Sequence, residues 1–388
     1  MVYIHIPFCR SFCTYCGFYS EILRGNGCGS LENGFVEALL KEISGRADEI
    51  NADLNTLYIG GGTPSVLPLT VFRRIIDALA EAGCRAPFDE FTVEVNPEDI
   101  VRRGEEYAEG LLSLGVDRIS MGVQSFDDRV LRWMNRRHDA AKARRAWSIL
   151  RSAGFKNISI DLIFGYDTAC IPGMEKVDGE EFWKESLEQA LDISGDGVLP
   201  SHISAYQLST EPGSALEKLI ARGKYIDAPE ELCRRQYDLM CETFAKNGYH
   251  HYEVSNFALP GKEAVHNSAY WNYVPYVGLG PGAHSFSLTG GRAVRRWNNS
   301  DLAAYISDPL HTHGSEILDE EQVRIEKIML ALRTDKGIAG SFLRGDASSM
   351  AACHRLTDSG LLVPCGDDRL RIPENQFFIS DNIISDLV

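Results

Sequence analysis

The chain has 388 residues, of which 44% are hydrophobic and 10% aromatic, so it can bury a core larger than that of one small domain. Its formal net charge of −16 argues against a broad phosphate-binding surface, and therefore against nucleic acid as the main partner. No apolar run approaches the roughly 18 residues of a membrane-spanning helix and the first residues do not form a signal peptide, so we predict a cytoplasmic protein without an integral membrane segment.

Strand patterns and helix patterns alternate along the first half of the chain. The expected strands are 2–6, a segment that ends in the glycine turn 60–64, 90–95, 117–121, 157–163 and 201–206. The expected helices are 33–50, 69–83, 102–114, 139–153 and 181–193. This alternation favours parallel βαβ units, and about six such units favour a partial or complete barrel with its chemistry on the loops that follow the strands.

The second half of the chain has a different character. Residues 165–185 are rich in turn formers and predict a long irregular connection. From residue 321 onward, an amphipathic helix precedes a second helix and a small hairpin, which resembles a compact winged-helix-like module. We therefore predict an α/β fold with a small C-terminal helical domain.

Three cysteines, Cys9, Cys13 and Cys16, follow the first strand with the spacing Cys-x3-Cys-x2-Cys. Thiolates are the usual ligands of iron–sulfur clusters, which commonly take four protein ligands. Three ligands from one loop can hold three irons of a cubane and leave the fourth iron open to a small molecule. A zinc site with a distant fourth ligand and a set of unrelated core thiols are the alternatives. The other seven cysteines, including Cys28, show no such spacing and are predicted to be ordinary thiols.

The cysteine spacing after a first strand resembles the radical S-adenosylmethionine (SAM) superfamily. The resemblance implies a partial (β/α)6 barrel and a [4Fe-4S] cluster whose open iron is chelated by the amino and carboxylate groups of SAM. It implies three parts: a core barrel over 1–225, a barrel extension over 226–315 and a C-terminal winged-helix-type domain over 316–388. In this class the cofactor carries the chemistry and the protein orients it.

The sequence is similar, more narrowly, to the branch of that superfamily that contains the HemN and HemW proteins. The similarity implies SAM contacts at Tyr3, Tyr15, Gly61, Gly62, Thr63, Glu94, Gln124, Arg136 and Asp161. The residue types suit these roles. The carboxylates of Glu94 and Asp161 can accept hydrogen bonds from ribose hydroxyls or the amino group, and Arg136 can pair with the carboxylate of SAM.

Two activities occur in this branch. The oxygen-independent coproporphyrinogen III oxidases decarboxylate two propionates to give protoporphyrinogen IX, and their cluster loop carries a further cysteine where this chain has Phe18. The segment "HNSAYW" (266–271) instead matches the His-Asn-x-x-Tyr-Trp signature of the HemW haem chaperones. We therefore expect a haem chaperone with a [4Fe-4S] cluster and SAM, and we keep the oxidase as the alternative. A radical SAM methyltransferase is a third, weaker hypothesis.

The same resemblance implies haem or porphyrin as the ligand and client haemoproteins as partners. The sequence leaves the electron donor and any enzymatic turnover of SAM undetermined, and it is compatible with a homodimer. His266 is a candidate axial ligand of haem iron, with Tyr270 and Trp271 offering flat surface for the macrocycle; a structural role for His266 is the alternative. The arginines of "RAVRR" (292–296) either pair with haem propionates or form a solvated face.

Overall fold

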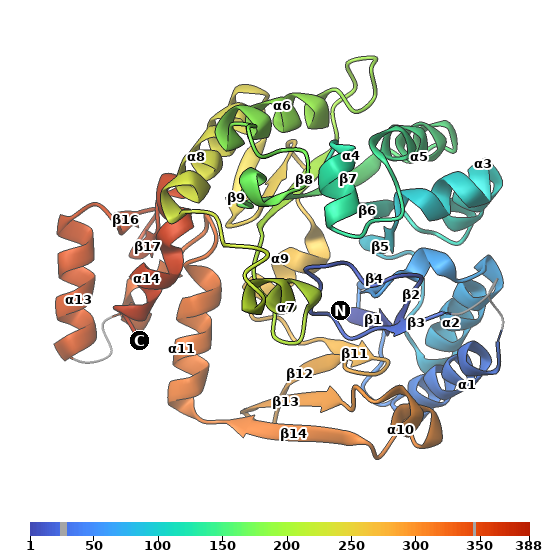
Figure 1. Ribbon diagram of the computed structural model, residues 1–388. Coiled ribbons are helices and arrows are strands. Elements are labelled where there is room, and N and C mark those ends of the chain that lie inside the picture. The colour runs from blue at the N-terminus through green and yellow to red at the C-terminus, as the bar shows by residue number, and fades with distance from the viewer. Residues whose placement is uncertain (24–28, 344–346) are drawn as a thin grey trace.

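The computed structural model describes residues 1–23, 29–343 and 347–388, so that Cys28 lies outside the described residues. Its centre is a curved nine-stranded sheet in the order β11-β1-β4-β5-β6-β7-β8-β10-β9, wrapped by helices on its outer side (Figure 1). The strands are β1 (Val2–Ile6), β4 (Thr56–Gly61), β5 (Glu90–Val95), β6 (Arg118–Gln124), β7 (Asn157–Phe164), β8 (His202–Gln207), β9 (His250–Glu253), β10 (Asn256–Ala258) and β11 (Val277–Leu279).

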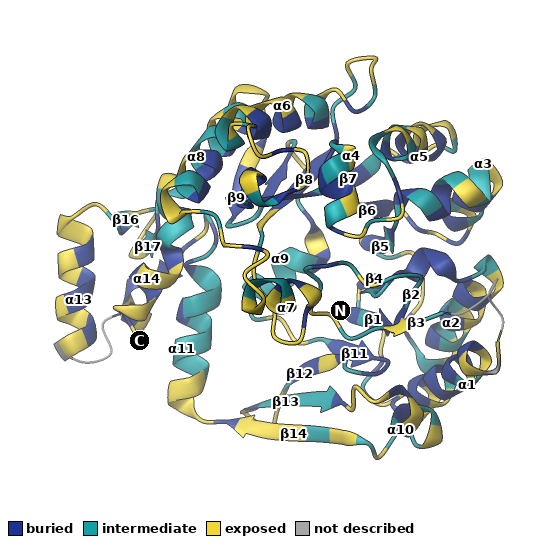
Figure 2. Ribbon diagram, viewed as in Figure 1, coloured by how far each residue is buried: buried dark blue, intermediate teal, exposed yellow. Residues whose placement is uncertain are grey.

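The six strands β1, β4, β5, β6, β7 and β8 pair in parallel in chain order, which confirms the predicted partial barrel. Their residues are mostly buried, as expected for parallel strands that are covered on both faces (Figure 2). The covering helices are α1 (Ser30–Gly45), α2 (Leu69–Ala82), α3 (Pro97–Ser113), α4 (Asp128–Trp133), α5 (Ala140–Ser152) and α6 (Gly179–Leu191).

Later segments extend both edges of this sheet. At one edge β11 adds to β1 in parallel, and at the other β10 and β9 continue from β8 in antiparallel pairs. The connecting helices are α7 (Ala215–Ala221), α8 (Glu230–Lys246) and α9 (Val265–Trp271). The 226–315 segment therefore contributes strands to the main sheet.

A second, three-stranded antiparallel sheet lies beside the first and consists of β12 (His284–Thr289), β13 (Arg292–Asn298) and β14 (His313–Leu318), with α10 (Leu302–Ser307) between the last two strands. The turn "GLGPG" (278–282) leads into it. The buried Glu42 carboxylate fixes this turn, accepting from the Gly280 amide (2.9 Å), the Arg46 guanidinium (2.9 Å) and the Tyr305 hydroxyl (2.7 Å). Gly280 has φ +98° and a Cβ there would collide with the carbonyl oxygen of His5, so this glycine allows the turn to approach β1.

The C-terminal region packs at one side of the barrel (Figure 1). It contains α11 (Glu320–Ala331), β15 (Ile338–Ala339), α12 (Gly340–Leu343), α13 (Ala347–Asp358), the hairpin β16 (Val363–Pro364) and β17 (Arg369–Arg371), and α14 (Ser380–Ser385). Helix α11 begins at a capping box, in which Asp319 and Gln322 satisfy each other's backbone amides. The predicted helices and hairpin are thus present. None of the helices in the described ranges is both long and apolar enough to cross a bilayer.

Several predicted boundaries were wrong. Helix α1 ends at Gly45 and not at residue 50, because the side chain of Arg46 turns inward to Glu42 and the 278–280 turn. Helix α3 begins at Pro97, whose fixed φ suits a first helical position. The irregular connection ends at 178, since α6 begins at Gly179 behind the capping side chain of Asp178.

Candidate functional site

The carboxyl ends of the barrel strands surround one cavity of about 680 Å³. The cysteine loop after β1, the glycine turn after β4 and the segment after β5 all contribute to its lining, as the parallel topology predicts. Of the candidate residues, the cavity lining includes Cys9, Cys13, Cys16, Tyr15, Gly61, Gly62, Thr63, Glu94, Gln124, Arg136 and Asp161. The fold therefore brings together eleven side chains or turn positions that lie up to 152 residues apart in the sequence.

The cysteine loop is held at both of its ends and in its middle. The short strands β2 (Phe8–Cys9) and β3 (Glu21–Ile22) pair in parallel and close the loop. Within it, the buried Thr14 donates from its amide to the Met134 carbonyl (3.0 Å) and from its hydroxyl to the Trp133 carbonyl (2.7 Å). These bonds fasten the loop to the end of α4, so the three thiols face the cavity from a fixed backbone.

The three thiols are partly exposed and carry no disulfide. Within the described residues, no three His, Cys, Asp or Glu side chains converge on a position for a single metal ion. In a cubane each thiolate binds a different iron, so its three sulfurs stand further apart than the ligands of one ion.

A chain of hydrogen bonds joins two of the cysteines across the cavity wall. Thr63 Oγ1 lies 3.4 Å from Cys9 Sγ and accepts from Asn96 Nδ2 (3.1 Å). Asn96 Oδ1 accepts from Arg136 Nη2 (2.6 Å), and Arg136 Nη1 donates to Cys13 Sγ (3.3 Å). Sequence reasoning missed Asn96, although it lies only two residues after the candidate Glu94.

The Arg136 guanidinium is held in place, but one of its N–H donors has no partner among the described residues. Its Nη2 also donates to the Gly122 carbonyl (2.7 Å), which holds the guanidinium in place. Its Nε is buried and has no hydrogen-bond partner among the described residues. A buried N–H without a partner is costly, so this atom is well suited to an anionic group of a ligand.

The glycine turn after β4 lies against the cysteine strand. Gly61 has φ +109°, and a Cβ on Gly62 would lie 2.7 Å from the Phe8 carbonyl oxygen and 3.0 Å from that of Ile6. Only glycine allows this close approach. The Gly61 amide donates to Glu94 Oε2 (3.0 Å), so the turn also positions a carboxylate of the cavity.

Two carboxyl groups in the cavity have raised pKa values. Burial raises the pKa of Glu94 to about 7, although the Tyr58 hydroxyl donates to its Oε1 (2.7 Å) and opposes the shift. Burial likewise raises the pKa of Asp161 to about 6, against the opposing charge of Arg118. Such perturbed groups in a cavity are typical of functional sites. Tyr58 lines the cavity and was not predicted from the sequence.

Of the other two candidate positions, Gln124 lines the cavity and Tyr3 does not. Gln124 lines the cavity with φ 67°, unusual for a residue other than glycine, at an irregularity in the β6–β7 register. Tyr3 lies outside the set of described residues that line the cavity. Its hydroxyl shares a hydrogen bond with His5 Nδ1 (3.0 Å), and its ring lies 6.0 Å from that of Tyr58. Its contact with SAM stays a prediction.

The "HNSAYW" segment forms α9, apart from the cavity. His266 is fully buried, with its Nδ1 2.8 Å from Thr56 Oγ1 and its Nε2 3.1 Å from the Tyr270 hydroxyl. Burial lowers the pKa of His266 to about 3. The Glu90 carboxylate accepts from the amides of Val265 (2.8 Å) and His266 (3.2 Å), which ties α9 to β5. Both ring nitrogens are thus engaged, and the geometry favours the structural alternative over an axial ligand. Tyr270 and Trp271 are half-buried.

Two further segments that the sequence analysis singled out have partners of their own within the protein. Arg295 pairs with Glu316 (3.0 Å) and Glu326, and Arg296 lies 3.4 Å from Glu49, so protein carboxylates already engage two arginines of "RAVRR". Residues 165–185, all of them described, contribute nothing to the cavity lining. They pack instead on a second apolar cluster that includes Tyr166, Ile171 and Met174.

Comparison with known proteins places the chain in a family. The model of the radical SAM superfamily matches residues 3–171. A relative from Lactococcus lactis described as "Heme chaperone HemW" is 35% identical over 338 residues, covering 87% of this chain and 82% of the relative. The chain belongs to the HemW family of the radical SAM superfamily. A second HemW relative, from Synechocystis, is 32% identical over 388 residues, and the match covers 96% of this chain and 89% of the relative.

The fold agrees with that assignment. The solved structure of the radical SAM enzyme coproporphyrinogen III oxidase (HemN) from Escherichia coli matches with a TM-score of 0.77 at 22% identity, covering 100% of this chain and 89% of that chain. Membership of the superfamily implies a [4Fe-4S] cluster and SAM. The residues present fit both groups, because three thiols, an unpartnered buried Arg136 Nε and a glycine cradle face one cavity.

Proposed function

We propose that this HemW-family chain is a haem chaperone, which binds haem and transfers it to haemoproteins while holding a [4Fe-4S] cluster and SAM. The observation that carries the proposal is its 35% identity, over 87% of its length, to a relative described as a heme chaperone. The "HNSAYW" signature supports it. Phe18 in place of a further cysteine weighs against the oxidase alternative, and the HemN likeness, at 22% identity, concerns the fold alone.

In this proposal Cys9, Cys13 and Cys16 hold the cluster. Arg136 would bind the carboxylate of SAM through its unpartnered Nε, and the glycine turn would receive the amino group. Glu94, Asp161 and Gln124 would accept or donate hydrogen bonds to the rest of the cofactor, with Tyr15 and Thr63 beside them. When bound, the cluster and SAM supply one-electron chemistry, and the residues of this chain bind, orient and shield them from water.

The test begins with anaerobic reconstitution of the full chain with iron and sulfide. We expect the absorption and EPR signals of a [4Fe-4S] cluster, and a change in the EPR signal of the reduced cluster when SAM is added. Haemin titration should then give a saturable Soret band, and incubation with an apo-haemoprotein should move the haem to that protein.

An assay with coproporphyrinogen III under the same anaerobic conditions distinguishes the alternatives. We expect no decarboxylation. Formation of protoporphyrinogen IX with consumption of SAM would establish the oxidase activity in place of the chaperone. A protein that shows neither product nor haem binding would overturn both and direct attention to methyl transfer.

A further inference from the structure

All ten histidines of the chain lie in its described part, and only some of them can reach a haem iron. The side chains of His5, His138, His202, His251 and His266 are buried. Both ring nitrogens of His250 are engaged, Nδ1 by Glu263 (3.4 Å) and Nε2 by Asp335 (2.9 Å). The exposed histidines that remain are His284, His311, His313 and His354. Since haem needs an accessible imidazole, the axial ligand should be sought among these four.

Three of these four histidines line one pocket. It has a volume of about 540 Å³ and lies where β12 begins, β13 ends and β14 begins. That end of the three-stranded sheet is beside α10 (Figure 1). His284, His311 and His313 contribute to its lining, together with Trp297 and Tyr19. Flat aromatic surface and imidazoles in one pocket suit a planar metal macrocycle.

His311 has the arrangement of a metal-ligating histidine. Its Nδ1 lies 3.0 Å from Asp308 Oδ1 and 3.1 Å from Oδ2, and its side chain is 80% exposed. Its Nε2 has no hydrogen-bond partner among the described residues and is therefore available to iron. A carboxylate on the second ring nitrogen fixes the tautomer and makes the imidazole a stronger ligand. The Thr312 hydroxyl donates to the Asp308 carbonyl (2.7 Å), which fixes the turn that carries both residues.

The aromatic surface of the pocket is also preformed. The ring of His284 stacks on that of Trp297, with centroids 6.2 Å apart and an interplanar angle of 29°. On the next strand, Gly314 leaves room for the indole, because a Cβ there would lie only 2.6 Å from Trp297 Nε1. Asn299 and Ser300 on the pocket rim are exposed and offer neutral donors for propionate groups.

We propose that the haem of this chain binds in the pocket at the end of β12, β13 and β14, with the Nε2 of His311, held by Asp308, as the axial ligand of the iron. This inference rests on the proposed haem-chaperone function and assigns its ligand to a site apart from the SAM cavity. It also explains how His266 can belong to the family signature and still be buried, since that residue then holds α9 in place.

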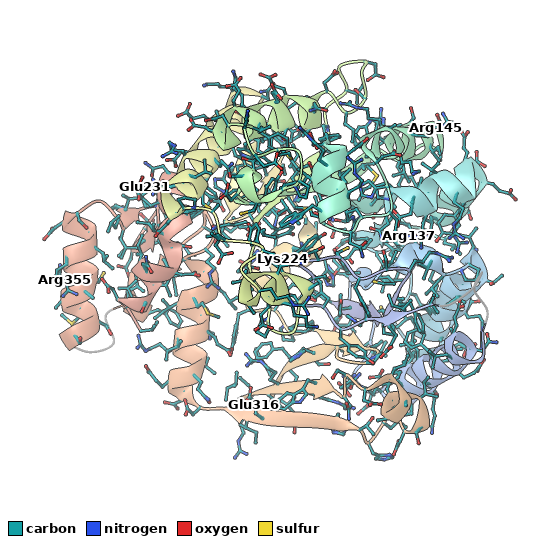
Figure 3. All side chains as sticks on the ribbon, viewed as in Figure 1. Arg137, Arg145, Lys224, Glu231, Glu316 and Arg355 are labelled. Carbon is teal, nitrogen blue, oxygen red and sulfur yellow. The ribbon has the colours of Figure 1, made fainter. Side chains whose placement is uncertain are left out.

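The test is a haemin titration of the full chain and of single variants, followed by Soret absorption and by resonance Raman spectroscopy of the complex after chemical reduction to ferrous haem. His311→Ala should weaken haemin binding by roughly tenfold or more and remove the iron–histidine stretching band. Asp308→Asn should weaken binding less and lower the frequency of that band, a change that a merely structural role would not produce. His354→Ala is the matched control, because it removes another exposed histidine. Its neighbour Arg355 is labelled on α13 at the left of Figure 3, whereas β14 begins beside α10 at the lower right of Figure 1.

The outcomes separate the two proposals. If the unmodified chain binds no haemin, the chaperone function itself fails. If it binds haemin and His311→Ala leaves affinity and spectrum unchanged, while folded His266→Ala loses the band, the chaperone function stands and this site is overturned. Equal loss in His311→Ala and His354→Ala would indicate adventitious imidazole binding and would also overturn it.

Discussion

The cavity at the carboxyl ends of the barrel strands and helix α9 both contain residues of a family signature, but a described polar group is left without a partner in the first, whereas both ring nitrogens of His266 are satisfied in the second. In the cavity Arg136 Nε has no partner among the described residues, and the thiols of the cysteine loop are partly exposed. In α9 both nitrogens of His266 are bonded, and its ring is fully buried. A signature residue can thus serve a ligand in one place and the fold in another, and hydrogen-bond satisfaction distinguishes the two cases.

Replacing a cluster cysteine should have the largest effect. Cys13→Ser removes one of three thiolates, so we expect nearly complete loss of cluster iron and of the cluster absorption after anaerobic reconstitution. Cys170→Ser is the control, since Cys170 lies in the 165–185 segment outside the cavity lining. Retention of a full complement of iron by Cys13→Ser would contradict the cluster assignment.

His266→Ala tests whether His266 stabilises the fold, as its two buried hydrogen bonds indicate. It leaves Thr56 and Tyr270 without their buried partner and opens a space beside Tyr58, so we expect the free energy of unfolding to fall by about 2–4 kcal/mol. Denaturant unfolding measures this. Haemin affinity of the folded protein should stay unchanged. A variant with normal stability and no haem binding would make His266 a ligand and break the contrast drawn above.

Arg136→Gln should weaken SAM binding by roughly 10- to 100-fold, because it removes a charge-assisted contact from a buried position. Isothermal titration of the reconstituted protein gives the dissociation constant. Arg132→Gln, four residues earlier on α4 and exposed, is the matched control. An unchanged SAM affinity would mean that the open Nε serves something else.

Asn96→Ala should act in the same direction with a smaller effect, a several-fold loss of SAM affinity, because it releases Arg136 and Thr63 without removing either. The EPR signal of the reduced cluster should also change, since both residues contact thiols of the cysteine loop. If neither quantity moves, the hydrogen-bonded chain between Cys9 and Cys13 has no part in positioning the cofactor.

The pH dependence of SAM binding should be the smallest effect, a few-fold. The pKa values of about 7 for Glu94 and about 6 for Asp161 mean that both groups are protonated at pH 5 and become acceptors as pH rises. SAM affinity should therefore increase between pH 5.5 and about 7.5, and Glu94→Gln should flatten the upper part of that rise.

The raised pKa of Glu94 has the opposite consequence for the stability of the chain without SAM, which should decrease as pH rises. The folded pKa of Glu94 is raised from 4.5 to about 7, so its contribution to the free energy of unfolding is present at low pH and is lost as pH rises through that range. A SAM affinity that falls between pH 5.5 and 7.5 would show that these carboxyls do not bind the cofactor.

The sequence alone determined the barrel and much of the cavity. Parallel strands place all their following loops at one edge, so the order of motifs along the chain was enough to predict that Cys9, Gly61 and Glu94 would meet. Arg136 was a candidate only through the family resemblance. Arg137, labelled in Figure 3, also lines that cavity and was not predicted. Residues such as Asn96 and Tyr58 were missed because their types are common in strands and turns, and only their partners reveal a role.

Tertiary structure alone decided which polar groups are already satisfied. A one-dimensional pattern shows His266 beside a tyrosine and a tryptophan, but it cannot show that Thr56, 210 residues away, occupies the other ring nitrogen. Nor can it show that His284, 27 residues before His311, lines the same pocket. Burial and hydrogen-bond partners depend on contacts between distant segments, and those contacts distinguish a histidine that holds the fold from one that is free to bind a metal.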